Sequence, residues 1–295
     1  MENTIDLKYE IIQLSSKTKF NPLLLEKDYH LTRILGKISE RKIENLTFKG
    51  GTCLNKCYLG FYRLSEDLDF VLNKDVKSLT KMQIKKILDN LRRKIFEILK
   101  ELDLEVNQKL GEGWKMLTSK AEPKIVGLEI ISTYLSIIDG STQKIKIEIS
   151  FRRKLINPTQ TRPIHHEFIN ALGEPILKED VKIEAIDLSE NFAEKFRALV
   201  TRKNIAIRDI FDIYFILNNN ILKIDEKSIA LSLLKLRETL GQEYSKKDLI
   251  DFMKNLNRKT SSLNEKELLS VLKSGESTNV EKMIKEISES FLTFS

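Results

Sequence analysis

The chain alternates between segments whose apolar residues recur at helical spacing and segments in which every second residue is apolar. The first kind predicts helices over the first forty residues, with a break at Asn21-Pro22, and another over 76–102. The second kind predicts strands at 46–48, 67–72, 104–108, 124–138, 143–151 and 181–186. Asp139-Gly140, between two of these strands, is typical of a hairpin turn.

From Leu188 onward the pattern is almost entirely helical. This order of elements predicts an α+β fold, in which a mixed sheet with flanking helices precedes a helical region. We therefore expect two domains, covering 1–187 and 188–295.

Composition narrows the class of protein. A hydrophobic fraction of 41% over 295 residues supplies a core, and no stretch approaches the ~20 apolar residues of a membrane span. The N-terminus lacks the apolar run of a signal peptide, so we expect a cytoplasmic protein with no membrane association. The net charge of +7 favours polyanionic partners, although solvated helix faces explain the excess of basic residues equally well.

The two cysteines, Cys53 and Cys57, lie one helical turn apart. A zinc site would need further ligands, and the histidines are His30, His165 and His166. We expect two ordinary buried residues in a reducing compartment, and no zinc site.

Three carboxylates occupy alternating positions on predicted strands. Asp67 and Asp69 share one face of their strand, and such a pair repels unless a cation lies between the two groups. Glu148 alternates with isoleucines on a later strand, and it would complete a trio if the two strands were neighbours. Mg²⁺ prefers oxygen ligands of this kind, and a pair of such ions assists phosphoryl transfer. Glu148 would also suit deprotonation of an attacking hydroxyl.

The glycine pair just before these strands suits a phosphate. Gly50 and Gly51 follow a predicted strand and lead into a short helix, which Thr52 is expected to cap. An isolated Asp-x-Asp is common on exposed strand faces, and a Gly-Gly-Thr alone is weak evidence. Their coupling at short range favours a nucleotide site.

The run FKGGTCLNKCYLGFYRLSEDLDF resembles the signature of the AbiEii/AbiGii family of nucleotidyltransferase toxins, which are related to the MenT toxins. LEKDYHLTRIL upstream and AEKFRALVTRKNIAIRDIFDIYFI downstream resemble further family segments, so the resemblance spans roughly residues 22 to 218. It implies a DNA polymerase β-like nucleotidyltransferase fold. Cys53 stands where the family commonly has serine.

The resemblance also implies residue roles. Asp67 and Asp69 would bind Mg²⁺ or Mn²⁺, and Lys195, on the helical domain, would reach the triphosphate in the active-site cleft. Asp209 would support the site from the same domain, while Glu148 matches a family carboxylate only loosely. The remaining nucleotide-binding positions are Gly50, Gly51, Thr52, Lys56, Ser65, Arg202 and Asp212.

The expected function is transfer of NMP from an NTP to an RNA acceptor, the tRNA 3′ end. The family implies the toxin of a type IV toxin–antitoxin or phage-defence (abortive infection) system, with a cognate antitoxin encoded nearby. Two alternatives stay open on the sequence: an acceptor hydroxyl on a protein or small molecule, and a non-catalytic RNA-binding module.

Overall fold

The chain forms two units, and each is described by itself. The N-terminal unit ends at Ile186 and the C-terminal unit begins at Asp187. The computed structural model describes residues 4–75, 79–118, 124–151, 155–170, 173–256, 263, 265–276 and 278–292. Part of the predicted 76–102 helix therefore lies outside the described residues.

Helices in the N-terminal unit begin where the sequence supplies caps. Asn21 accepts a hydrogen bond from the Leu23 amide at 2.8 Å, and Pro22 is the first residue of the next helix. Thr80 and Gln83 form a reciprocal capping box at the start of the long helix. The helices are α1 (Thr4–Thr18), α2 (Pro22–Glu40), α3 (Gly50–Cys53), a π-helix (Leu54–Leu59) and α4 (Lys81–Glu101).

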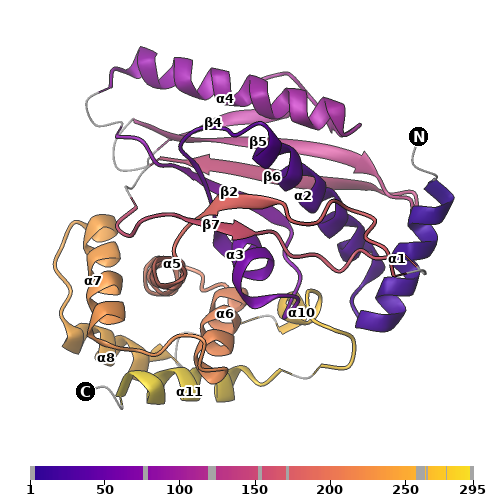
Figure 1. The fold of residues 1–295 in the computed structure, drawn as a ribbon. Coiled ribbons are helices and arrows are strands. Elements are labelled where there is room, and N and C mark those ends of the chain that lie inside the picture. Colours follow the sequence, from indigo (N-terminus) through magenta and orange to yellow (C-terminus); the bar gives the residue numbers. More distant parts are fainter. Residues whose placement is uncertain are drawn as a thin grey trace. The chain divides into compact units, whose positions relative to one another are not determined.

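The sheet of this unit mixes parallel and antiparallel pairs (Figure 1). Its strands run in the order β3-β5-β6-β2-β1-β8-β7, with β4 also paired to β5. The pairs β2–β6 and β1–β8 are parallel, and the remaining pairs are antiparallel. The strands are β1 (Leu46–Lys49), β2 (Asp67–Leu72), β3 (Glu105–Val106), β4 (Trp114–Thr118), β5 (Ile125–Leu135), β6 (Thr142–Ser150), β7 (Gln160–Pro163) and β8 (Lys182–Ala185).

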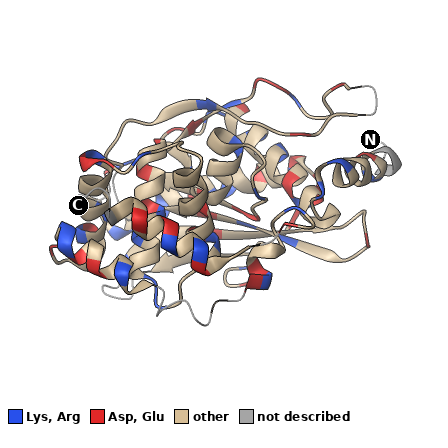
Figure 2. Ribbon diagram, turned by 90° about the horizontal axis from the view of Figure 1, so that it is seen from below, with Lys and Arg blue, Asp and Glu red and all other residues tan. Residues whose placement is uncertain are grey.

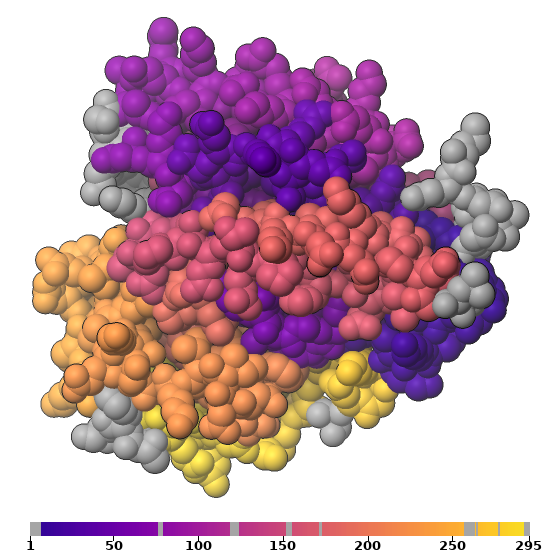
Figure 3. All heavy atoms as spheres, viewed as in Figure 1, coloured from indigo at the N-terminus to yellow at the C-terminus, as the bar shows by residue number. Residues whose placement is uncertain are grey.

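One face of the sheet is packed under α2 and α4. Leu68 and Phe70 on β2 are fully buried, as are the alternating isoleucines of β6. They join the apolar sides of α2 and α4 in one core, and the rings of Phe48 and Phe70 lie 5.3 Å apart. In the space-filling view α2 lies between α4 and the segment that carries β7 and β8 (Figure 3). The predicted mixed sheet with flanking helices is confirmed.

The strands β4 and β7 are not predicted by the sequence pattern. Their sequences, WKMLT and QTRP, lack a regular alternation of apolar and polar residues. β7 lies at an edge of the sheet, where proline is tolerated, and β4 pairs only with β5 among the described strands. β7 is held by its hydrogen-bonded pairing with β8, whereas Trp114 and Met116 of β4 also pack against the core.

The C-terminal unit is helical, as the pattern predicts. Lys235 on its third helix is buried and pairs with Glu190 at 2.5 Å, which compensates both charges in the interior. Basic and acidic residues are mixed along the helices rather than gathered by sign (Figure 2). No helix in the described part of the chain is long and apolar enough to span a membrane. The helices are α5 (Leu188–Thr201), α6 (Ile207–Asn218), α7 (Glu226–Leu240), α8 (Lys246–Lys254), α10 (Glu265–Leu269) and α11 (Val280–Leu292).

Candidate active site

The predicted carboxylates lie on two adjacent strands. β2 and β6 pair in parallel, and the register sets Asp69 opposite Glu148 and Asp67 opposite Lys146. Asp67 and Asp69 are both half-buried, whereas Leu68 between them is fully buried on the other face. The sheet therefore presents the three carboxylates on the face opposite to α2 and α4.

The environment of Asp67 and Glu148 disfavours their charged forms. Burial raises the pKa of Asp67, with a further contribution from the Asp69 charge, although Lys146 opposes the rise. Burial also raises the pKa of Glu148, again assisted by Asp69. Acidic groups that a fold holds close together at such a cost are typical of functional sites.

Two lysines that the sequence interpretation did not assign lie beside the carboxylates. Lys146 Nζ is 3.2 Å from Asp67 Oδ2, and Lys49 on β1 is paired in register with Asp69. The positive charges of both lysines partly oppose the rise in the pKa of Glu148 that burial causes. The alternation of β6 does place Lys146 on the polar face with Glu148, but only the strand pairing identifies its partner.

The glycine turn lies against the carboxylates. Gly50 has a φ of +80°, and a Cβ there would lie 2.6 Å from Asp69 Oδ2. A Cβ on Gly51 would lie 2.6 Å from Arg63 Nη2, and Arg63 is buried. Gly50 requires glycine because of its left-handed backbone conformation, whereas a side chain at Gly51 would require the Arg63 guanidinium group to move.

Thr52 has a different role from the predicted helix cap. The short helix α3 begins at Gly50, and its N-cap residue, Lys49, makes no side-chain capping bond. The buried Thr52 hydroxyl instead lies 2.8 Å from Ser65 Oγ and donates to the Asp67 carbonyl oxygen. Because Ser65 precedes β2 by two residues, this contact ties the glycine turn to the strand that carries the aspartates.

Lys56 is not brought to this group. Its side chain is completely buried on the π-helix, where Nζ lies 2.5 Å from Asp28 Oδ2 and 4.9 Å from the centre of the Phe61 ring. The expectation that Lys56 contacts a nucleotide is therefore not supported by its position. The sequence could not reveal this burial, because the partner lies 28 residues away on α2.

The Asp28–Lys56 pair anchors the segment that carries the glycine turn. Burial raises the pKa of Asp28 and lowers that of Lys56, and each partner opposes the shift of the other. Asp28 Oδ1 is buried without a hydrogen-bond partner. The pair is thus costly to bury, and a side chain that lost its partner would strongly destabilise the fold.

The residues predicted in the C-terminal unit form an ion cluster of their own. Lys195 on α5 contacts Asp209 Oδ1 at 2.7 Å and Asp212 Oδ2 at 2.8 Å, both on α6. Arg202, at the end of α5, pairs with the other oxygen of Asp209. The two carboxylates are buried, so they hold the position of the Lys195 ammonium group.

A divalent metal fits the donor chemistry of the β2–β6 face. Asp67, Asp69 and Glu148 supply oxygen ligands, and a cation would relieve the repulsion among their negative charges. No group of three or more His, Cys, Asp or Glu side chains among the described residues is arranged to enclose a metal. Mg²⁺ does not need one, since one or two carboxylates with water and substrate phosphates commonly hold it. Both cysteines are buried free thiols.

Comparison with known proteins places these features in a family. The family model described as nucleotidyl transferase AbiEii toxin of type IV toxin–antitoxin systems matches residues 33–290. JHP933 from Helicobacter pylori is similar in structure, with 15% identity, a TM-score of 0.52 and 93% of each chain covered. A second H. pylori protein, named as a nucleotidyltransferase, has 15% identity and a TM-score of 0.50 over 92% of this chain and 93% of its own. No curated protein sequence matches the chain.

Breaking the buried ion pair is expected to destabilise the protein. Lys56→Met leaves the Asp28 carboxylate buried without its cation, which should lower the free energy of unfolding by about 3–5 kcal/mol. The double variant Asp28→Leu/Lys56→Met removes both charges and should recover most of that loss. Urea unfolding of the three proteins measures the effect, and a Lys56→Met protein as stable as wild type would contradict the assigned role.

The raised pKa of Glu148 predicts a pH-dependent stability. Above the ordinary glutamate pKa of about 4.3, the folded state binds the Glu148 proton more readily than the unfolded chain does, so stability falls as pH rises through the raised value. Glu148→Gln should therefore raise Tm at pH 8 and leave it unchanged near pH 4. Thermal unfolding followed across this range tests the prediction, with Glu105→Gln at an exposed position as the control. A uniform difference at every pH would contradict it.

Proposed function

The chain belongs to the AbiEii family of nucleotidyltransferase toxins of type IV toxin–antitoxin systems, and we propose that it transfers NMP from an NTP to an RNA acceptor, the tRNA 3′ end. The observation that carries the proposal is the pairing of Asp69 with Glu148 in register on adjacent strands, beside Asp67. In a nucleotidyltransferase, a fixed group of carboxylates of this kind is suited to a reaction at a phosphate.

Asp67 and Asp69 are the proposed ligands of Mg²⁺ or Mn²⁺. When bound, such an ion neutralises the phosphate charge and the charge that develops on the leaving group. The proposal is supported by the resemblance of the Asp-x-Asp run to the family signature and by the raised pKa of Asp67, which burial causes and the nearby Asp69 charge increases. Lys146 pairs with Asp67, so its positive charge would partly offset the negative charge that the site presents to a nucleotide.

Glu148 is the proposed general base. The acceptor hydroxyl attacks the α-phosphorus of the NTP, the new oxygen–phosphorus bond forms, and the bond to the bridging oxygen breaks to release pyrophosphate. The proton of the hydroxyl passes to Glu148. A carboxylate whose pKa is raised by burial is a better proton acceptor than an ordinary surface glutamate.

The phosphates of the NTP are assigned to the glycine turn. Gly50 lies against Asp69 at the start of this turn, and Ser65 supplies a partly exposed hydroxyl group, which the buried Thr52 hydroxyl holds in place beside Gly51. Lys56 is left out of this ligand set because it is buried, and we assign it a positioning role through Asp28.

The C-terminal residues keep the roles that the family resemblance implies. We propose Lys195 as a ligand of the triphosphate and Asp209 as the group that orients it, supported by their 2.7 Å contact. Arg202 and Asp212 complete the cluster and are proposed as supporting nucleotide-binding residues.

The biological setting follows from the family. A type IV system pairs the toxin with an antitoxin, and we propose that this chain acts in the cytoplasm and halts translation by blocking tRNA ends, as part of a phage-defence response. A protein or small-molecule acceptor is the main alternative. Labelling with α-³²P NTPs distinguishes these acceptors, because the label stays on the molecule that receives the NMP.

Transfer to tRNA is the central prediction of the proposed function. Purified protein incubated with Mg²⁺, total tRNA and each α-³²P-labelled NTP in turn should label tRNA with one or two of the four nucleotides. Asp67→Asn and Asp69→Asn should each lower the rate by about 10²–10³-fold, because each removes a negative charge from the proposed metal site. Asp103→Asn at an exposed position should leave the rate unchanged.

The destination of the label decides between acceptors. Label on the protein would indicate a protein acceptor, and label on neither, from folded protein, would count against RNA transfer. Equal labelling by wild type and by both aspartate variants would remove Asp67 and Asp69 from the catalytic group.

Cation binding should be visible without turnover. Adding Mg²⁺ at about 100 times its Kd should raise the wild-type Tm by a few degrees, roughly 2–5 °C, because the ion relieves repulsion among the carboxylates. Asp69→Asn should abolish most of this shift, and removal of the ion with EDTA should reverse it. The same shift in the variant would place the cation elsewhere.

A further inference from the structure

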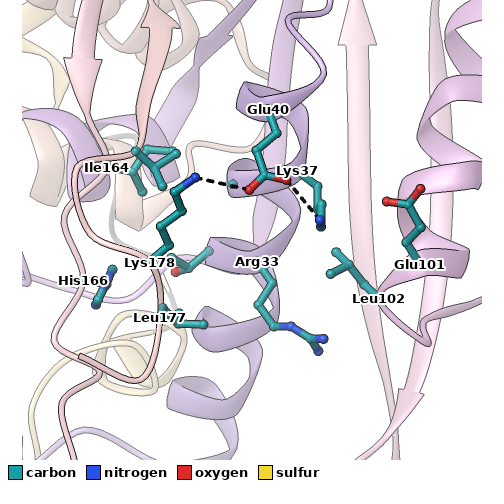
Figure 4. A pocket seen from close by; sticks show the side chains of 12 residues that line it. Arg33, Lys37, Glu40, Glu101, Leu102, Ile164, His166, Leu177 and Lys178 are labelled. Atoms are coloured by element: carbon teal, nitrogen blue, oxygen red, sulfur yellow. Dashed lines mark hydrogen bonds and ion pairs between the residues drawn. The ribbon is translucent and has the colours of Figure 1, made fainter. Parts of the chain in front are cut away.

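A cavity lies on the side of the N-terminal unit that carries α2 and α4. It has a volume of about 250 Å³, near the lower end of the ~300–1,000 Å³ usual for ligand pockets. Its walls come from α2, from the end of α4 and from the segment between His166 and Val181 (Figure 4). None of the proposed catalytic residues lines it, and the carboxylates on β2 point to the opposite face of the sheet.

Gly36 keeps this cavity open. It lies inside α2, where glycine lowers helix stability relative to alanine. Neither a left-handed backbone nor a close neighbour requires it, because φ at Gly36 is not positive and nothing lies within 4 Å of a Cβ built there. A side chain at this position would project into empty space. Glycine at this position therefore lowers the stability of α2 and leaves the cavity unfilled.

The polar lining carries an excess of positive charge. Lys37 and Lys178 share one carboxylate, Glu40, at 3.0 and 3.6 Å. The other acid of the lining, Glu101, is already bound by Arg41, which lies outside the cavity.

Arg33 is a cation of the cavity lining whose charge neither Glu40 nor Glu101 neutralises. It makes no ion pair with any residue that the structure describes, and its guanidinium group lies 5.5 Å from the centre of the Tyr29 ring. In the close view Arg33 projects from α2 between the Leu177 side and the Leu102 side of the cavity (Figure 4). A guanidinium group so placed matches the geometry of a carboxylate or phosphate group.

The remaining lining is apolar. Leu102, Ile164, Leu177 and Val181 supply aliphatic surface beside the open position of Gly36. We propose that this cavity is a binding site for a small organic anion, in which Arg33 pairs with a carboxylate or phosphate group and the aliphatic wall receives a compact apolar body. The site is separate from the proposed catalytic group and does not depend on the proposed reaction.

Simple probes test the site on the full chain. Phenyl phosphate and phenylacetate carry the two possible anionic groups, and phenylacetamide is the neutral analogue of the second. Ligand-observed NMR titrations should show saturable binding of at least one anion and about tenfold or more weaker binding of the amide. The stronger of the two anions identifies the class of natural ligand.

Variants locate the binding. Arg33→Gln should weaken the anion about tenfold or more, Gly36→Leu should abolish binding by filling the cavity, and Gly36→Ala should weaken it less. Arg93→Gln, an exposed cation of α4 outside the cavity, and Asp67→Asn should bind as wild type does. Circular dichroism and thermal unfolding confirm that each variant is folded.

Three results would overturn the proposal. They are the absence of saturable binding for both anions, equal binding of the amide, and unchanged binding in folded Arg33→Gln and Gly36→Ala proteins. Loss of binding in Asp67→Asn would instead assign the anions to the carboxylate face, which also contradicts the cavity as their site.

Discussion

Along the paired strands β2 and β6, apolar side chains that enter the core alternate with polar side chains on the opposite face of the sheet. Leu68 and Phe70 are buried under the helices, and the alternation then obliges Asp67 and Asp69 to share the opposite face. The parallel register adds Glu148 beside Asp69. The hydrophobic energy of the core therefore holds the carboxylates together against their repulsion. The pKa values of Asp67 and Glu148 are raised by burial and, in addition, by the nearby Asp69 charge.

The glycine turn depends on a second constraint in the interior. Asp28 and Lys56 have no access to water, so each charge is tolerable only beside the other. Their contact fixes the π-helix to α2, and the π-helix continues directly from the helix that starts at Gly50. A motif that resembles a phosphate-binding loop thus relies on a buried ion pair for its position.

The family assignment and the geometry support different parts of the functional account. The match over 33–290 establishes a nucleotidyltransferase of the AbiEii family, whereas the solved structures, at 15% identity, establish the fold. The paired strands supply the physical argument for where the chemistry occurs, because they gather acids that a purely structural surface would keep apart. The cavity beside Arg33 is independent of that argument and rests on its own charge and shape.

The sequence by itself determined the α+β class, the main helices and strands, and the shared face of Asp67 and Asp69, because these follow from local periodicity. The short strands β4 and β7 were not predicted, because QTRP has no apolar alternation and in WKMLT the alternation of Trp114 and Met116 is interrupted by Leu117. Only the tertiary structure decided that Lys56 is buried against Asp28, that Lys146 binds Asp67, and that Gly36 borders a cavity. Each of these depends on a residue far away along the chain, and local pattern carries no information about which distant charge or surface a side chain will meet.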